Sequence, residues 1–571
     1  MNKKIKKLIS ITAIMFASLS LSSCLYNENE PKPEPDPTPV DPGKTDPEPV
    51  EPGTDPVDPG TDPVDPGTDP VDPVEPEMEK LTTKTKLDYT YKDYAEGNVY
   101  YFDFCPTIGN PKVLIVPIWF NDSNNYINTS KKETIRQDIE KAYLGSKEET
   151  GWHSVKTYYE EESAGKMHLN GVVSEWRSVN YSTMQLGQDQ QGEIVSELVQ
   201  SSVDWFFDNN PTYSRSDFDT DNNGYIDGVF LIYGAPDYSA LGKNSWDNLW
   251  AYCYWLQEPN ETSNPIPNVY FWASYDFMYS KGTSASSKTG KSSAGSGDTS
   301  HCKIDAHTYI HEMGHVLGLD DYYDYGNNNY SPAGGFSMQD SNIGGHDPFS
   351  VMAFGWAEPY IVTKDVEVTI GAFSETKDVV MIPANTSGTN SPFDEYILLE
   401  LFTPTGLNQL DCTYTYDSFI KGPNKTGIRM WHVDARLAYC NSTKTVDGYE
   451  EPVFKASQLT TNPLDDKAVY GVYQAFSNTY DYDGYSSVLG EDYYDYNILQ
   501  LIRNDKTITH KTDNYLEASD LFGNGTYSLT SYSKQFVKGN KFNNGSSLAY
   551  SIKVEITGSG ASAQAKLTIT K

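Results

Sequence analysis

A proline-rich, acidic stretch between residues 31 and 80 divides this chain into a part that cannot pack and a part that can. It holds 16 of the 33 prolines in the 571-residue sequence, with 15 acidic and 3 basic side chains. The unit Thr-Asp-Pro-Val-Asp-Pro-Gly begins at Thr54, recurs at Thr61 and nearly recurs at Thr68. Proline and charge repulsion hold such a segment extended, and it has little apolar surface to bury. We therefore predict a disordered linker over residues 25–82 and ordered structure after it.

The residues before the linker have the pattern of a targeting segment. Four lysines between positions 3 and 7 precede an apolar stretch from Leu8 to Leu21, which is too short to span a bilayer comfortably. Ser22 and Ser23 then precede Cys24, as in the lipobox of bacterial lipoproteins, where the cysteine carries the lipid. We expect a lipoprotein signal peptide over residues 1–24 and an extracytoplasmic protein, held at the outer membrane or cell surface by lipid on Cys24 alone. An ordinary signal peptide is the alternative.

The composition excludes several classes of function. The net charge is −36, and binding to nucleic acid needs clustered lysine and arginine, so we expect no nucleic-acid partner. Besides Cys24 there are five cysteines and no Cys-x-x-Cys pair, which excludes a thiolate zinc ribbon and allows at most two disulfides within the chain. The sequence also lacks a glycine-rich phosphate loop and a Gly-x-Ser-x-Gly elbow. We expect a monomer.

The ordered region changes character near residue 360. Before that point, apolar runs of strand length alternate with stretches typical of helices, and after it short alternating stretches predict strands. We predict an α+β fold, with one domain of mixed helices and strands over residues 83–360 and a β-sandwich-like region over residues 361–571, which forms one domain or two with a break near 510. The segments are strands at 112–120, 167–173, 228–233, 366–370, 396–401, 428–433 and 552–556, and helices at 154–163 and 307–317.

Two histidines four residues apart mark the most informative segment of the chain. On a helix, His311 and His315 project from the same face and can share a metal ion. Glu312 lies one residue further round, where its carboxylate can reach a metal-activated water without being a ligand. We therefore predict zinc at His311 and His315, with Glu312 as the general base. A buried helix with structurally satisfied histidines is the alternative reading. His307 shares the same face, and we expect it to lie outside the metal site.

The residues after the two histidines supply a third ligand. Gly318 can adopt the left-handed conformation that ends a helix and turns the chain back. Asp321, ten residues after His311, can then return to the metal. The complete pattern, His-Glu-x-x-His-x-x-Gly-x-x-Asp, is much more specific than its first five positions alone. Asp320 remains an alternative third ligand, because the bend itself cannot be seen in the sequence.

The segment from His311 to Asp321, followed by Tyr-Tyr-Asp at 322–324, resembles the immune inhibitor A family of secreted bacterial metallopeptidases, a metzincin-type group. The resemblance implies a zinc-dependent enzyme with a metzincin-type catalytic domain over residues 83–360, which would consist of a mixed sheet plus a zinc-binding helix. It also implies a methionine turn beneath the metal. The stretch 334–340 is similar to that turn and makes Met338 the candidate, with Met352 as the second choice. Weaker similarity extends from about residue 112 to the C-terminus, including 158–166 and 427–434. Within the latter, we expect His432 and Asp434 to be structural.

An aspartate-rich loop precedes the strand at 228–233. It has oxygen-bearing residues at alternate positions and a glycine at the sixth, like the first part of an EF-hand loop, but the twelfth position is Phe230 instead of an acid. The resemblance implies a similar loop in the family. We expect a structural calcium ion here, against the alternative of a solvated turn, with candidate ligands Asp219, Asp221, Asn223, Tyr225 and Asp227.

The predicted function is hydrolysis of internal peptide bonds in extracellular proteins. The main rival is a cell-surface protein that binds glycoproteins or glycans, in which the metal site would be vestigial. An intact ligand set with its base argues against that rival, since a retired site has no physical reason to keep Glu312. A second rival is a metal-dependent hydrolase that acts on another bond, such as an amide in a glycan or lipid.

Overall fold

The computed structural model describes most of the chain after the linker. The described ranges are 78–97, 102–189, 192–243, 247–279, 301–325, 331–385, 390–416, 420–446, 449–475, 477–479, 495–512 and 515–571. Residues 79–571 form one unit. Cys24 and residues 25–77 of the predicted linker lie outside the described residues, so the lipid anchor stays a prediction. The end of the predicted linker is ordered, because the N–H of Leu81 donates to the carbonyl of Glu367 at 2.7 Å and the N–H of Glu367 donates to the carbonyl of Glu79 at 2.8 Å. Within these ranges, no helix combines the length and apolar character needed to cross a bilayer.

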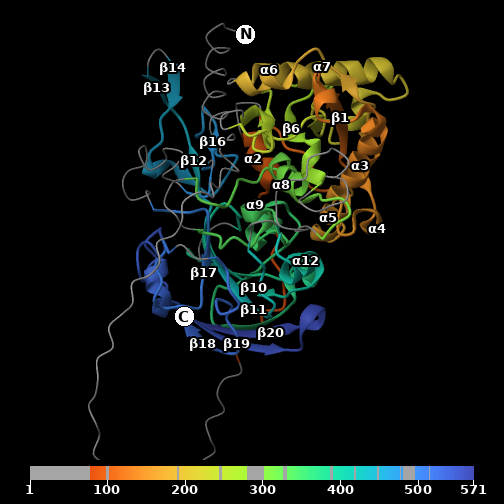
Figure 1. Ribbon diagram of the computed structural model, residues 1–571. Coiled ribbons are helices and arrows are strands. Elements are labelled where there is room, and N and C mark those ends of the chain that lie inside the picture. Colours follow the sequence, from red (N-terminus) through yellow and green to blue (C-terminus); the bar gives the residue numbers. More distant parts are fainter. Residues whose placement is uncertain are drawn as a thin grey trace, which may run out of the picture. The chain divides into compact units, whose positions relative to one another are not determined.

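A six-stranded sheet forms the framework of the N-terminal half (Figure 1). Its order is β2-β1-β4-β6-β5, with β3 also paired to β1; these neighbours are parallel except for the edge strand β5, which runs antiparallel to β6. The long apolar run at β1 explains its central place, because seven of its eight residues are buried. The strands are β1 Lys112–Trp119, β2 Asn170–Val173, β3 Arg177–Ser178, β4 Val229–Tyr233, β5 Tyr252–Trp255 and β6 Val269–Ser274.

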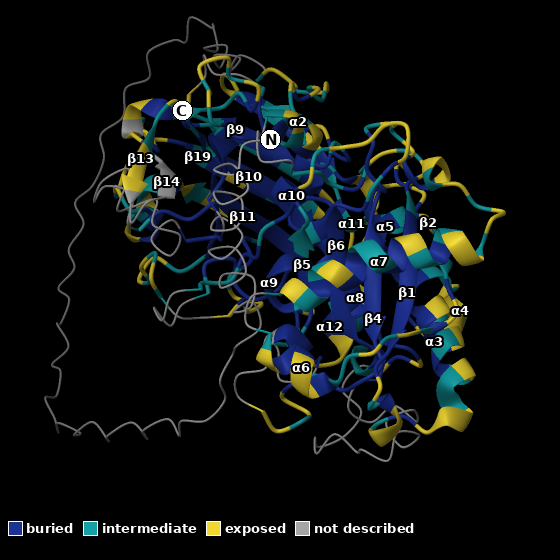
Figure 2. Cartoon of the chain, turned by 90° about the horizontal axis from the view of Figure 1, so that it is seen from above, coloured by how far each residue is buried: buried dark blue, intermediate teal, exposed yellow. Residues whose placement is uncertain are grey.

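Helices cover both faces of this sheet (Figure 2). Alternate side chains of β1 point to opposite faces, so Leu114 packs in the core under α7, whereas Val113 packs in the core that holds α3, α5 and α8. The fold is thus layered, with α8 at the face opposite α7. The helices of this half are α2 Tyr91–Gly97, α3 Lys132–Leu144, α4 Lys147–Thr150, α5 Val155–Glu162, α6 Thr183–Gln188, α7 Glu193–Asn209, α8 His307–Val316, α9 Met338–Ser341 and α10 Pro348–Ala353.

The C-terminal half consists mainly of strands. A five-stranded sheet, β17-β11-β10-β9-β7, and a four-stranded sheet, β18-β19-β20-β8, both contribute side chains to one apolar core. Smaller sheets are formed by β15-β12-β16 and β13-β14. The elements are β7 Tyr360–Ile361, β8 Val366–Gly371, α11 Phe373–Thr376, β9 Val380–Pro383, β10 Glu395–Phe402, α12 Gln409–Thr413, β11 Gly427–Asp434, β12 Leu437–Tyr439, β13 Thr443–Val446, β14 Tyr449–Pro452, β15 Leu459–Thr460, β16 Val472–Tyr473, β17 Leu499–Ile502, β18 Gly525–Ser528, β19 Ser551–Thr557 and β20 Gln564–Thr570.

The two halves share a core and are joined by buried polar contacts. The largest hydrophobic cluster contains residues of the zinc-motif helix α8, such as Ile310, and residues of β11 and β17, such as Trp431 and Leu501. Glu162 of α5 forms a buried ion pair with Lys377, the residue that follows α11. The predicted boundary near residue 360 therefore marks a change of secondary structure and not a gap in packing.

The structure confirms the mixed α and β content and the predicted elements at β1, β2, β4, α5, α8, β8, β10, β11 and β19, with ends that differ by a few residues. The metzincin-type assignment and the β-sandwich stay predictions. The predicted elements did not include the amphipathic helix α7 or the strand β6. Cys105, Cys253, Cys412 and Cys440 are buried thiols outside any disulfide.

Candidate metal centre

The helix α8 holds His311, Glu312 and His315 in place because nearly all of it is buried. Its apolar side chains pack against β5, β6 and α5, which fixes the rotation of the helix about its axis. The helix ends at Val316, and Gly318 then takes a φ of 114°, a conformation that a residue with a side chain rarely adopts. The chain turns there, as the sequence predicts, and brings Asp321 back toward the histidines.

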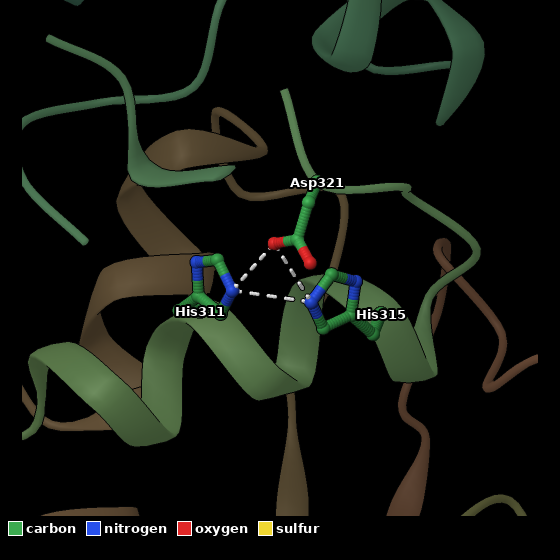
Figure 3. Close-up of side chains that lie close together, drawn as sticks. All are labelled: His311, His315 and Asp321. Atoms are coloured by element: carbon green, nitrogen blue, oxygen red, sulfur yellow. Dashed lines mark hydrogen bonds and ion pairs between the residues drawn. The ribbon is translucent and has the colours of Figure 1, made fainter. Parts of the chain in front are cut away.

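Three side chains converge above the helix (Figure 3). The Nε2 atoms of His311 and His315 are 3.1 Å apart. Oδ1 of Asp321 lies 2.9 Å from Nε2 of His311 and 3.3 Å from Nε2 of His315. Among the described histidine, cysteine, aspartate and glutamate residues, these three form the one group whose ligand atoms all lie within 4.8 Å of one another. Asp321, and not Asp320, is the acid that the structure brings to the histidines.

Hydrogen bonds on the far side of each ring direct Nε2 toward the centre of this group. Nδ1 of His311 donates to the carbonyl of Met338 (2.8 Å), and Nδ1 of His315 donates to the carbonyl of Leu319 (2.7 Å). A neutral imidazole with its proton on Nδ1 has its lone pair on Nε2, so two lone pairs face each other. This arrangement is unfavourable unless a cation lies between them, and the carbonyl contacts are those expected of metal-ligating histidines.

The two oxygens of Asp321 have different surroundings. Oδ2 accepts hydrogen bonds from the hydroxyls of Tyr323 (3.0 Å) and Tyr325. Oδ1, which faces the histidines, is buried and has no hydrogen-bond donor. A buried carboxylate oxygen without a donor is costly. The donor set, two imidazoles and one carboxylate, therefore fits a zinc ion, which takes nitrogen and oxygen ligands in this combination.

The charges of the centre also favour a cation. Burial alone would disfavour the charged forms, but Asp321 raises the pKa of His315 to about 10. The two imidazoles in turn hold the pKa of the Asp321 carboxyl well below its usual range, against the opposite effect of burial. In the absence of a metal, a proton would supply the positive charge that this group requires.

Glu312 lies beside the three converging side chains and is fully buried, with no hydrogen-bond donor at Oε2. Burial raises its pKa to about 7, although His315 and His311 act in the opposite direction. Glu312 and His315 line a cavity of about 120 Å³ that also reaches Asp321. A carboxyl group with this pKa, beside the three converging side chains and a cavity, can exchange a proton near neutral pH.

The wall of this cavity comes from three parts of the chain. Phe102 and Phe104 contribute aromatic side chains from the N-terminal segment, and the edge strand β5 contributes Trp255. The ring centroid of Trp255 lies 5.1 Å from that of Phe102 and 5.9 Å from that of Phe104. Gln474 and Ala475 add a wall from the C-terminal half. Aromatic side chains thus form much of the lining of the cavity.

Met338, the candidate for the methionine turn, is the first residue of α9 and contacts His311. Its side chain is fully buried, and its carbonyl is the acceptor for His311. Gln339 packs across Gly314 of α8 so closely that a side chain at position 314 would collide with its amide. Met352, the second choice, is buried in α10. The contact of Met338 is made by its backbone, so the structure gives its side chain a packing role.

His307 does not join the converging group. It is fully buried between the rings of Trp152 and Tyr416, at 4.1 and 4.2 Å between centroids. Its Nδ1 lies 2.7 Å from Oδ1 of Asp305, and Nε2 lies 3.5 Å from Oδ1 of Asp411. His307 therefore anchors the start of α8 to α12 of the C-terminal half.

The aspartate-rich loop is closed largely by its own hydrogen bonds. The two oxygens of Asp219 accept main-chain N–H groups of the loop at 2.9 and 3.1 Å. Asp227 accepts the N–H and hydroxyl of Thr220 and the N–H of Lys112 at 2.7 to 3.0 Å. Asn223 accepts the N–H of Tyr225 at 2.8 Å. Four of the five candidate calcium ligands thus hold the shape of the loop.

Asp221 differs from these four because its Oδ1 is buried and has no hydrogen-bond donor. Its Oδ2 lies 3.7 Å from Nζ of Lys92. Asp103, which the sequence did not single out, accepts from Nδ2 of Asn223 at 3.0 Å. Burial and the neighbouring carboxylate of Asp221 raise the pKa of Asp103 to about 8, and burial raises that of Asp227 to about 7. These groups would repel one another if all were ionised.

His432 and Asp434 of β11 have structural partners. Nε2 of His432 lies 2.9 Å from Oε1 of Glu395, and Asp434 forms a two-pronged ion pair with Arg436 at 2.7 Å. Oδ2 of Asp434 also accepts from Nδ2 of Asn543 at 2.9 Å. The contacts agree with the structural role expected from the sequence.

Several site residues were not identified from the sequence. Tyr323 belongs to the motif after Asp321, but the motif does not indicate a role for its hydroxyl. Tyr325 lies just beyond the motif. Gln474 and Asn478 come from the C-terminal half, and no pattern in the sequence connects them to the metal group. For Tyr323 and Tyr325, the spacing of two and four residues from Asp321 was a usable signal.

One comparison with known proteins identifies the N-terminal half. Residues 108–344 match the family model described as immune inhibitor A peptidase M6, catalytic domain. No curated protein matches this sequence closely enough to count as a relative. The matched range contains the whole of the six-stranded sheet, α8, Asp321 and Met338. The match places residues 108–344, which contain the three converging side chains, in the immune inhibitor A family of metallopeptidases.

Proposed function

We propose that this chain is a zinc-dependent endopeptidase in which His311, His315 and Asp321 hold the metal and Glu312 is the general base. The peptidase domain sets the substrate class, which is proteins or peptides. The observation that carries the zinc assignment is the convergence of the Nε2 atoms of His311 and His315 on the buried Oδ1 of Asp321, with Nδ1 of each ring held by a main-chain carbonyl. Bound zinc would act as a Lewis acid toward the scissile carbonyl and make water more acidic.

The residues of the chain then perform the proton transfers. Glu312 takes a proton from the attacking water at its carboxylate and delivers it to the nitrogen of the leaving amine. Burial favours the protonated form of Glu312, which helps the group to take a proton from water, and a neighbouring zinc ion would favour release of that proton. The carbonyls of Met338 and Leu319 keep the imidazoles oriented throughout.

The zinc assignment can be tested with the purified chain. We expect close to one zinc per molecule by elemental analysis, cleavage of casein that a zinc chelator abolishes, and recovery when zinc is returned. Calcium should not restore the activity. Cleavage that persists in metal-free protein would contradict the proposal. Inactivity toward a peptide library with cleavage of glycan amides would support the rival hydrolase instead. The family match does not favour a glycan-binding protein with a vestigial site.

We also propose that the loop at 219–227 binds a structural calcium ion, with Asp221 as the ligand whose oxygen needs a partner. The supporting observation is the group of buried carboxylates, whose mutual repulsion a divalent cation would remove. We expect millimolar calcium to raise the unfolding temperature of the protein by several degrees.

The control is the variant Asp221→Asn, which should unfold at nearly the same temperature with and without calcium while it keeps its zinc. Magnesium serves as the second control, because a loop of this kind with flexible oxygen ligands favours calcium. Equal stabilisation of the wild-type protein and the variant by calcium would contradict the assignment to this loop.

A further inference from the structure

Asn478 is a fully buried residue that lies 157 positions after Asp321 and yet contacts its backbone. It belongs to the segment between β16 and β17, outside the part of the chain that matches the catalytic-domain family. The main-chain N–H of Asn478 donates to the carbonyl of Asp321 at 3.2 Å. Its side-chain Nδ2 donates to the carbonyl of Tyr322 at 2.7 Å. One asparagine therefore binds two successive main-chain carbonyls, those of Asp321 and Tyr322.

The same side chain is fixed on its other side by β17. Oδ1 of Asn478 accepts the N–H of Leu499 at 2.8 Å, and Nδ2 donates to the carbonyl of Leu499 at 2.9 Å. The carbonyl of Asn478 also accepts the N–H of Ile498 at 2.9 Å. Because β17 is part of the five-stranded sheet, Asn478 connects the chain around Asp321 to a rigid element.

Asp321 needs such a support because it belongs to no helix or strand. The helix α8 ends at Val316, before Gly318. Beyond Gly318, the N–H of Tyr322 donates to the carbonyl of Gln339, which also belongs to the N-terminal half, at 2.8 Å. The carboxylate must nevertheless stay within about 3 Å of both imidazoles. Without the two contacts to Asn478, the carbonyls of Asp321 and Tyr322 would be less restrained, and a metal ligand tolerates little movement.

We propose that Asn478 is a positioning residue for the third metal ligand, so that the C-terminal half completes the metal centre of the N-terminal half. The inference rests on the proposed zinc function. The nearby residues Gln474 and Ala475 line the cavity beside Glu312, so this part of the C-terminal half reaches the site at more than one residue. The C-terminal half is thus part of the metal-binding apparatus and not only an appended module.

The test compares zinc affinity in the full chain for Asn478→Ala and a matched control, Gln535→Ala. Gln535 is buried and makes the same three kinds of contact: Oε1 accepts the N–H of Arg503 at 2.9 Å, and Nε2 donates to the carbonyls of Arg503 and Asp505 at 2.8 Å. Zinc affinity is measured by competition with a chromophoric chelator, and metal-free stability by thermal unfolding. We expect a 10- to 100-fold loss of zinc affinity in Asn478→Ala, the range typical of residues that orient metal ligands.

Gln535→Ala should lower the unfolding temperature of the metal-free protein to a similar extent and leave its zinc affinity unchanged. If Asn478→Ala does not fold, Asn478→Asp replaces it, because aspartate keeps the volume and the acceptor but loses the donor to Tyr322. Zinc affinity within about twofold of wild type in the folded variant, or an equal loss in Gln535→Ala, would overturn the inference. A wild-type chain that binds no zinc would instead refute the proposed function.

Discussion

Replacement of Glu312 by glutamine should lower kcat/KM for peptide hydrolysis by about 10²- to 10⁴-fold, the range supplied by a positioned general base. Glutamine has nearly the same shape, but its amide cannot take a proton from water. Because Glu312 is not among the three converging ligand groups, the variant should keep its zinc. The measurement is steady-state hydrolysis of a fluorogenic peptide, with metal content determined on the same samples.

Two controls separate the loss of the base from other causes. His315→Ala should lose both its zinc and its activity. Both variants should therefore be less active than wild type, but only Glu312→Gln should retain zinc. Metal-free Glu312→Gln should be at least as stable as metal-free wild type, because burial opposes ionisation of Glu312 and glutamine carries no charge to bury. Activity of Glu312→Gln within about tenfold of wild type would exclude Glu312 as the base.

The parts of the fold that could be predicted are those in which local sequence determines structure. The buried strand β1 follows from an unbroken apolar run, and α8 follows from apolar residues at helical spacing. The return of Asp321 follows from Gly318, because few other residues accept its φ of 114°. Each of these features depends on fewer than a dozen neighbouring residues, so the local sequence is enough to predict it.

The features that could not be predicted join residues far apart in the chain. Asn478 reaches the backbone of Asp321 only because β17 lies beside the loop after α8, and nothing near position 478 indicates that contact. Asp103 joins the aspartate-rich loop for the same kind of reason. The boundary near residue 360 was visible as a change of pattern, but the pattern could not show that Trp431 packs in the same core as Ile310.

Among the polar contacts that join the two halves, we expect the buried ion pair between Glu162 and Lys377 to contribute most to stability. Both residues are almost completely inaccessible to solvent, and Oε1 of Glu162 also accepts the N–H of His346 at 2.6 Å. Glu162→Gln should lower the free energy of unfolding by about 3–5 kcal/mol at neutral pH, because it leaves the ammonium group of Lys377 buried beside a neutral amide. Urea denaturation of the full chain measures this loss.

The pH dependence and a second substitution distinguish a loss of charge from a loss of packing. Burial alone would raise the pKa of Glu162, but Lys377 and His346 outweigh it and lower the pKa to about 2. The stabilisation is therefore complete above the unfolded-state pKa near 4.5 and is lost as the pH falls toward 2, so wild type and variant should converge in acid. Adding Lys377→Met should recover much of the loss, because it removes the unpaired charge. A cost below about 1 kcal/mol for the single variant would mean that water or another anion reaches Lys377.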